Sequence, residues 1–176
     1  MIERMRDFAT RLIAPHPELH QRKDFPAELW QAMGAEGLLG IGLPQAYGGH
    51  GGDFLTMAEC CLALSETGGN LGVAMSWMAH NLNARLHLAA HGTEAQKSRW
   101  LPLLARGDST LSIAISEPGV GAHPKRLKCT ATRNGDDYVL NGEKAYLTNG
   151  PLADVFLVLA ITGHNAGRNE FSAFLV

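Results

Sequence analysis

The stretches that decide the fold of this sequence are IAISEPGVG, at residues 113–121, and YLTNG, at residues 146–150. Each is a short apolar run that reaches a hydroxyl residue and then breaks into a glycine turn. Such an edge suits a flat heteroaromatic ring, because aliphatic side chains pack on its faces while hydroxyls and backbone N–H groups reach its polar rim.

Helical spacing of apolar residues dominates the chain before these stretches. Asp53 is placed as the N-cap of one helix, and Thr93 with Gln96 forms the pattern of a capping box at the start of another. The spacing and the breaks predict helices over residues 2–13, 26–37, 53–67, 71–91 and 93–106.

The period of the sequence changes after Asp108 to short, β-branched runs separated by turn residues. Strands are predicted over residues 111–115, 129–133, 138–140, 144–148, 155–161 and 171–176. The fold class is therefore α+β: an all-α helical domain over residues 1–108 precedes a partial, antiparallel, β-barrel-like domain over residues 109–176. Because the last strand ends at the terminus, the open sheet edge is expected to pair with another chain or to belong to a longer protein.

Composition excludes several classes of function. The formal net charge of −2 gives no basis for binding nucleic acid, and no run of about 20 apolar residues predicts a membrane span. Three cysteines without a metal-ligand pattern indicate a reduced, cytoplasmic protein. His87 and His91 share a helical spacing, but no metal site is expected from them. The sequence has no P-loop or Rossmann glycine motif.

Six short blocks, taken in order, resemble the acyl-CoA dehydrogenase family. Those in the helical part are FPAELW at residues 25–30, GLLGI at 37–41, PQAYGGHG at 44–51 and GTEAQK at 92–97. Those in the β part are ISEPGVG at residues 115–121 and NGEKAYLTNG at 141–150, which resemble the two flavin segments of the family. The resemblance implies FAD as cofactor and α,β-dehydrogenation of an acyl-CoA thioester as the reaction.

The resemblance also assigns roles to individual residues. The Ser116 hydroxyl would bond the pyrimidine edge of the isoalloxazine, and Thr148 would lie near the flavin N5. Tyr146 stands where the family usually has tryptophan and would pack against the ring. The other residues expected to contact the cofactor are Ile113, Ile115, Gly121, Ala122 and Leu147.

Ala122 departs from the family pattern, which has a serine at this place. It is still expected to contact the cofactor and the acyl-CoA substrate, through its backbone only. The carboxylate that acts as base in the family belongs to a C-terminal domain with no counterpart here, so no catalytic residue is assigned. Glu117 and Glu143 are interpreted as structural, and the isolated chain is expected to be a truncated, inactive part of the enzyme.

The resemblance implies a homo-oligomer in fatty acid metabolism that passes electrons to an electron-transfer flavoprotein or a similar acceptor. Two alternatives stay open at this point. One is an acyl-CoA oxidase or flavin-dependent oxygenase on the same scaffold. The other is a non-catalytic remnant whose open sheet edge binds another subunit.

Overall fold

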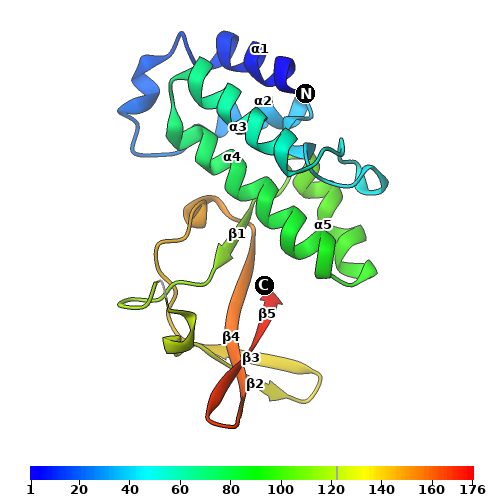
Figure 1. The fold of residues 1–176 in the computed structure, drawn as a ribbon, viewed down its shortest axis with the longest axis vertical. Helices are drawn as coiled ribbons and strands as arrows, with labels where there is room; N and C mark the ends of the chain where they lie inside the picture. Colours follow the sequence, from blue (N-terminus) through cyan, green and yellow to red (C-terminus); the bar gives the residue numbers. More distant parts are fainter. Residues whose placement is uncertain (122) are drawn as a thin grey trace. The chain divides into compact units, whose positions relative to one another are not determined.

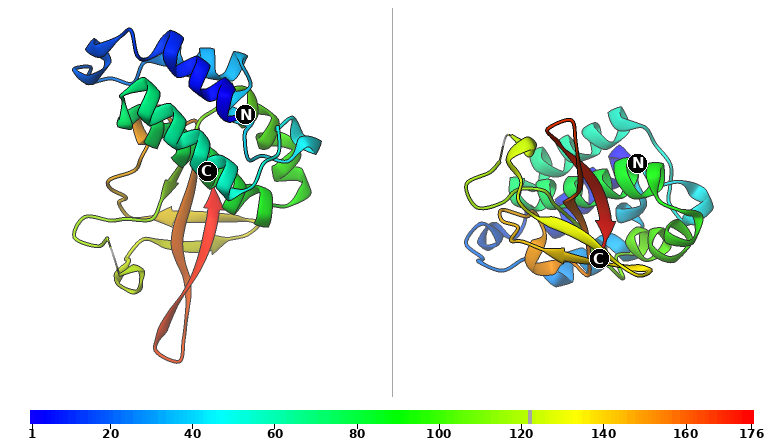
Figure 2. Two further views of the ribbon diagram at one scale, coloured as in Figure 1. Left: turned by 45° about the horizontal axis from the view of Figure 1, so that its top comes forward. Right: turned by 90° about the horizontal axis from the view of Figure 1, so that it is seen from below.

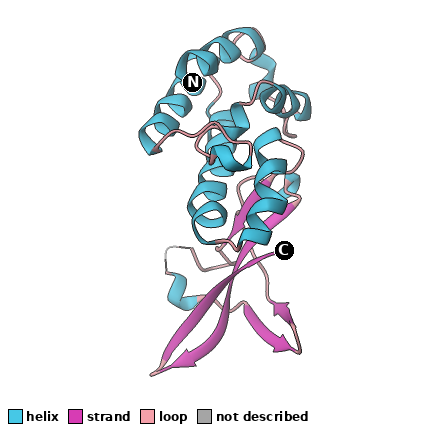
Figure 3. Cartoon of the chain, turned by 90° about the vertical axis from the view of Figure 1, so that its right-hand side faces the viewer, coloured by secondary structure: helices cyan, strands magenta, loops and turns pink. Residues whose placement is uncertain are grey.

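A computed structural model describes residues 1–121 and 123–176 of the chain. The chain divides into two compact units, Met1–Thr110 and Leu111–Val176. The first unit is built from helices, and the second is built mainly from strands, which Figure 3 distinguishes in cyan and magenta. The predicted fold class, a helical part followed by a β part, is confirmed.

The α-helices of the first unit agree with the predicted helices to within two residues at each end, except at the end of α4. They are α1 (Ile2–Leu12), α2 (Ala27–Ala35), α3 (Phe54–Gly68), α4 (Leu71–Asn83) and α5 (Glu94–Arg106), labelled in Figure 1. The packed faces of α1 to α4 meet in one apolar core, whose fully buried side chains include Met5, Phe8, Met33, Leu38, Met57, Leu64 and Trp77.

Two of these helices begin at the caps that the sequence predicts. The Asp53 carboxylate accepts a hydrogen bond from the Thr56 backbone N–H at 2.8 Å, which satisfies one of the unpaired donors in the first turn of α3. Thr93 and Gln96 form a reciprocal capping box at the start of α5. Both caps are local interactions, so the sequence alone identifies them.

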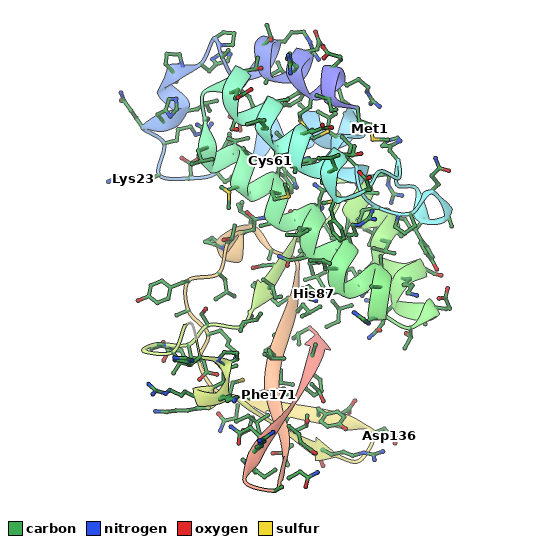
Figure 4. All side chains as sticks on the ribbon, in the orientation of Figure 1. Met1, Lys23, Cys61, His87, Asp136 and Phe171 are labelled. Carbon is green, nitrogen blue, oxygen red and sulfur yellow. The ribbon has the colours of Figure 1, made fainter. Side chains whose placement is uncertain are left out.

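The prediction of one continuous helix over residues 71–91 is wrong in one respect. Helix α4 ends at Asn83, and Ala84–Ala89 forms a π-helical segment, where Figure 4 labels His87. A π turn holds more residues than an α turn, and the apolar pattern does not distinguish the two. In this segment the Arg85 guanidinium donates to the Gly42 and Gly52 carbonyl oxygens, both at 2.6 Å. The arginine thereby ties the π-helical segment to the loop before α3.

A fully buried histidine lies between the helices of this unit. His80 has no solvent exposure, and its Nε2–H donates to the Leu104 carbonyl oxygen at 3.1 Å. Its ring meets the Trp30 ring edge to face, with centroids 5.1 Å apart. Burial lowers the pKa of His80 to about 4, although the hydrogen bond to Leu104 acts in the opposite direction. The imidazole is therefore neutral in the folded protein at neutral pH.

We predict that His80 makes the helical unit sensitive to acid. As the pH falls from about 6.5 to about 4, the unfolded chain takes up a proton that folded His80 does not. The free energy of unfolding should therefore fall over this window, by on the order of 3 kcal/mol at its lower end. Urea unfolding followed by the helical circular dichroism signal measures this slope. His80→Gln keeps a donor for Leu104 but cannot be protonated, and an unchanged slope in this variant would contradict the assignment.

The second unit is a five-stranded sheet. Its strands are β1 (Leu111–Ala114), β2 (Thr130–Asn134), β3 (Asp137–Asn141), β4 (Val155–Asn165) and β5 (Arg168–Leu175). Strands β2 and β3 form one antiparallel hairpin, with Asp136 at its tip in Figure 4. Strands β4 and β5 form a second, which appears as a twisted ribbon in orange and red in Figure 2.

The sheet is mixed, in contrast to the antiparallel sheet that the sequence pattern predicts. Strand β1 pairs in parallel with the start of β4, from Leu111 opposite Val155 to Ala114 opposite Val158. Strand β2 also runs parallel to β4, where Thr130 lies opposite Ile161. Parallel pairing requires a long connection, and the chain from residue 115 to residue 154 provides one between β1 and β4. Turn motifs reveal only hairpins between successive strands, so the sequence pattern did not reveal these parallel pairs.

The predicted strand over residues 144–148 is also wrong, because these residues form no regular strand. Tyr146 has φ of 59°, in the left-handed region, which interrupts any extended run. A β-branched and aromatic composition favours a strand locally, and only contacts with distant residues hold a tyrosine in this conformation. Separately, among the described residues no helix combines the length and the apolar character needed to cross a bilayer.

Candidate functional site

The first of the two glycine-containing segments leaves strand β1 and closes into a tight turn. Glu117 and Val120 exchange two backbone hydrogen bonds, each of 2.9 Å. Between them Gly119 has φ of 76°, a conformation that glycine adopts without strain. Ser116 therefore lies at the point where β1 has ended and the turn begins.

The second segment is an irregular extended stretch that ends in a turn. The Gly150 N–H donates to the Leu147 carbonyl oxygen at 3.0 Å, and Asn149 has φ of 65°. Tyr146 is 90% exposed in addition to its left-handed backbone. A large ring that is both exposed and held in an unfavourable backbone conformation contributes little to folding, so it is a candidate for a contact with a ligand.

The two segments lie side by side. The Ala145 N–H donates to the Ser116 carbonyl oxygen at 2.9 Å. The buried Ser112 hydroxyl donates to the Thr148 carbonyl oxygen at 2.7 Å. Because the higher-numbered residue of one segment meets the lower-numbered residue of the other, the two stretches run antiparallel. These bonds bring the two stretches singled out in the sequence to one place in the β unit.

A buried ion pair joins the same segments. The Lys144 ammonium lies 2.9 Å from a Glu117 carboxylate oxygen and also donates to the Ile115 carbonyl oxygen at 3.0 Å. The two side chains are only 10% and 5% exposed. Glu117 accepts two further hydrogen bonds, from the backbone N–H groups of Lys128 at 2.7 Å and Cys129 at 2.9 Å. One carboxylate thus connects the first segment, the start of β2 and the second segment.

The charge of Glu117 is stabilised by these contacts. Burial raises the pKa of its carboxyl, but the hydrogen bonds from the Lys128 N–H, the Lys144 ammonium and the Cys129 N–H outweigh burial and hold the pKa below its ordinary value. Glu117 is therefore ionised at neutral pH. Its contribution to stability is present above its ordinary pKa, near 4.5, and is lost as the pH falls through the lowered value.

The remaining predicted site residues surround these segments. Ile113, on β1, and Ile115 are half-buried, as is Leu147, whereas Thr148 and Gly121 are exposed. Ala122, predicted to contact both cofactor and substrate, lies outside the described residues. The hydroxyls of Ser116 and Thr148 make no hydrogen bond to another described residue, although the carbonyl groups of both residues are bonded.

Sequence reasoning missed two residues that hold the site together. The sequence pattern places Ser112 in an apolar strand and Lys144 in a motif, and it gives neither side chain a role of its own. A hydroxyl within an otherwise apolar strand was the available signal for Ser112, because a buried hydroxyl needs a partner. For Lys144 the sequence carries no comparable signal, since an isolated lysine is usually exposed.

We predict that Ser112, on strand β1, and Ser116, in the first segment, differ in their effect on folding. Ser112→Ala removes a buried hydrogen bond and leaves the Thr148 carbonyl without it, so the free energy of unfolding should fall by about 1 kcal/mol. Ser116→Ala is the matched control, because it removes no hydrogen bond to a described residue and should change stability by less than about 0.5 kcal/mol. Urea titration, monitored by amide hydrogen exchange in β1 and β4, measures the change in the free energy of unfolding of each variant. Equal losses would contradict the assignment.

Comparison with protein families identifies both units. The family model of the acyl-CoA dehydrogenase N-terminal domain matches residues 1–108, and that of the acyl-CoA dehydrogenase middle domain matches residues 112–176. The chain belongs to the acyl-CoA dehydrogenase family, as the resemblance of its six blocks predicted.

Individual relatives agree with this assignment. An acyl-CoA dehydrogenase of Bacillus subtilis (strain 168) is 36% identical over 177 residues, which cover 100% of this chain and 46% of the relative. A glutaryl-CoA dehydrogenase from Mycobacterium smegmatis, solved in complex with FADH2, is 31% identical with a TM-score of 0.88, over 99% of this chain and 44% of that one. A prolyl acyl carrier protein oxidase is 34% identical with a TM-score of 0.89, over 99% of this chain and 47% of that one. The chain thus spans about half the length of the relatives it matches.

Proposed function

We propose that the β unit binds FAD at the two adjoining segments and forms the flavin-binding part of an enzyme that dehydrogenates an acyl-CoA at the α and β carbons. The observation that carries this proposal is the hydrogen-bonded pairing of the segments around Ser116 and Thr148. Relatives that are acyl-CoA dehydrogenases, one of them solved with FADH2, support the choice of cofactor and substrate class.

The side chains at the segments fit a flavin in their chemistry. An isoalloxazine offers hydrogen-bond donors and acceptors on its pyrimidine rim, and the Ser116 and Thr148 hydroxyls have no bond to another described residue that would compete. In this proposal Ser116 bonds the pyrimidine edge, Thr148 lies near N5, and the exposed Tyr146 ring packs on the flavin. When bound, FAD supplies the chemistry that accepts the β hydrogen of the substrate as hydride.

The other predicted contacts complete the proposed site. Ile113, Ile115 and Leu147 are half-buried aliphatic residues, which suit the apolar faces of the ring. Gly121, exposed after the tight turn, leaves room for the backbone to approach the cofactor. The proposed contact of Ala122 with cofactor and acyl-CoA rests on the family resemblance alone, because this residue lies outside the described part of the chain. We also propose that the boundary between the helical domain and the flavin-binding domain lies after Asp108, so that the domains comprise residues 1–108 and 109–176.

The proposal assigns the catalytic base to no residue of this chain. The Glu117 carboxylate is bonded to Lys144 and to two backbone N–H groups, so it is not available to take a proton from a substrate. The base, the contacts with an electron acceptor such as an electron-transfer flavoprotein, and the assembly into a homo-oligomer are proposed to depend on the part of the family fold that these residues do not include.

Titration of FAD with the full chain tests the site. Binding should quench the FAD fluorescence, and Ser116→Ala or Thr148→Val should each raise the dissociation constant by about tenfold, the effect of one lost hydrogen bond. Thr132→Val is the matched control, because Thr132 is an exposed threonine on strand β2. A chain that does not bind FAD, or equal effects of Thr132→Val and Thr148→Val, would show that the site is wrong.

Anaerobic addition of an acyl-CoA tests where the base lies. The FAD absorbance of the isolated chain should not bleach rapidly, because proton abstraction requires a positioned carboxylate. The positive control is the same measurement on a fusion of this chain to the C-terminal domain of an acyl-CoA dehydrogenase. Rapid and complete bleaching by the 176 residues alone would overturn the assignment of the base.

An oxidase is the second candidate, and the prolyl acyl carrier protein oxidase among the structural relatives favours it. An oxidase and a dehydrogenase share the flavin segments and differ in the access of oxygen to the reduced flavin. Oxygen uptake after reduction by an acyl-CoA distinguishes them. The measurement uses the fusion of this chain to the C-terminal domain of an acyl-CoA dehydrogenase. Rapid uptake indicates the oxidase, and slow uptake indicates the dehydrogenase.

A further inference from the structure

Lys144 and Ala145 together hold the predicted flavin contact Ser116 and both of its neighbours, Ile115 and Glu117. The Lys144 ammonium bonds the Ile115 carbonyl oxygen on one side of Ser116 and the Glu117 carboxylate on the other, at 3.0 and 2.9 Å. The Ala145 N–H bonds the carbonyl oxygen of Ser116 itself, at 2.9 Å. Of this tripeptide's side chains, the Ser116 hydroxyl is the polar group that has no bond to a described residue.

The Lys144–Glu117 ion pair at the centre of this arrangement is stable only in a narrow range of geometries. Both side chains are at least nine-tenths buried, so each charge has lost most of its hydration. Attraction between buried charges offsets that loss only when the geometry is good and the remaining donors and acceptors are bonded. Glu117 meets this condition through the N–H groups of Lys128 and Cys129, and Lys144 meets it through the Ile115 carbonyl. A shift of either segment would break several of these bonds together.

We propose that the Lys144–Glu117 pair is a positioning element for the flavin: it fixes the backbone on both sides of Ser116 and so sets the place of the Ser116 hydroxyl relative to the second segment. This inference rests on the proposed FAD site and deepens it, by adding two residues that act through Ser116 without touching the cofactor. The rival explanation is a pair that only stabilises the fold of the β unit.

Paired substitutions separate positioning from stability. Lys144→Met leaves Glu117 as a buried, unpaired charge, so it should lower both the melting temperature and the affinity for FAD. Adding Glu117→Gln removes that charge, so the double variant should recover melting temperature while its dissociation constant for FAD stays raised by about tenfold or more. Lys144→Arg keeps the charge and the donors, and it should bind FAD within about threefold of the natural chain.

Lys128→Met is the matched control for loss of a nearby lysine charge. The Lys128 side chain is exposed, and its bond to Glu117 comes from the backbone N–H, which the substitution keeps. This variant should bind FAD like the natural chain. A double variant that recovers both melting temperature and FAD affinity would overturn the positioning role, as would a Lys144→Met chain that binds FAD normally.

Hydrogen exchange at the Ala145 amide gives a reading that does not depend on flavin. Its bond to the Ser116 carbonyl should protect it in the natural chain, and Lys144→Met and the double variant should exchange at least about tenfold faster there. Unchanged exchange overturns the positioning role even if FAD binds. If the natural chain does not bind FAD, the proposed function fails, and the exchange rates still decide whether the pair fixes the segment. If Lys144→Met does not fold, the double variant and Lys144→Arg still show whether the exchange rate of the Ala145 amide and the affinity for FAD depend on the ion pair.

Discussion

The antiparallel contact between residues 112–117 and residues 144–148 is the constraint on which the candidate site depends. No regular strand pairing maintains it, since residues 144–148 form no strand. Among the described residues, four hydrogen bonds maintain it instead: one from the Ser112 hydroxyl, one from the Ala145 N–H and two from the Lys144 ammonium. Irregular backbone that leaves a sheet must find partners for its polar groups, and here these partners also bring the two segments together.

The conformation of Tyr146 is understandable only in terms of this contact. A tyrosine in the left-handed region is unfavourable by about 1 kcal/mol, and its exposed ring recovers little of that through packing. The bonds made by its neighbours on both sides, Lys144 and Ala145 before it and Thr148 after it, fix the backbone there. Strain held in this way by surrounding contacts is typical of residues that serve a ligand. The flavin contact proposed for Tyr146 is in keeping with that pattern.

Local signals made the helical unit predictable, and distant contacts made much of the β unit unpredictable. Asp53 and Thr93 cap helices through residues three positions away, so the sequence contains the whole interaction. The parallel pairing of β1 with β4 joins residues far apart in the chain, and the predicted antiparallel sheet was wrong in this respect. The π-helical segment Ala84–Ala89 was missed for a related reason, since Arg85 anchors it to a distant loop.

The sequence by itself determined the order of a helical and a β part, the helix caps, the two glycine-containing segments and, through their motifs, the family. These are properties of neighbouring residues or of short motifs, which need no knowledge of the fold. The tertiary structure decided that the two segments adjoin, that Lys144 and Glu117 form a buried ion pair between them, and that Tyr146 is exposed. The physical reason is that hydrogen bonds and ion pairs between distant residues depend on distances and burial, and neither exists until the chain has folded.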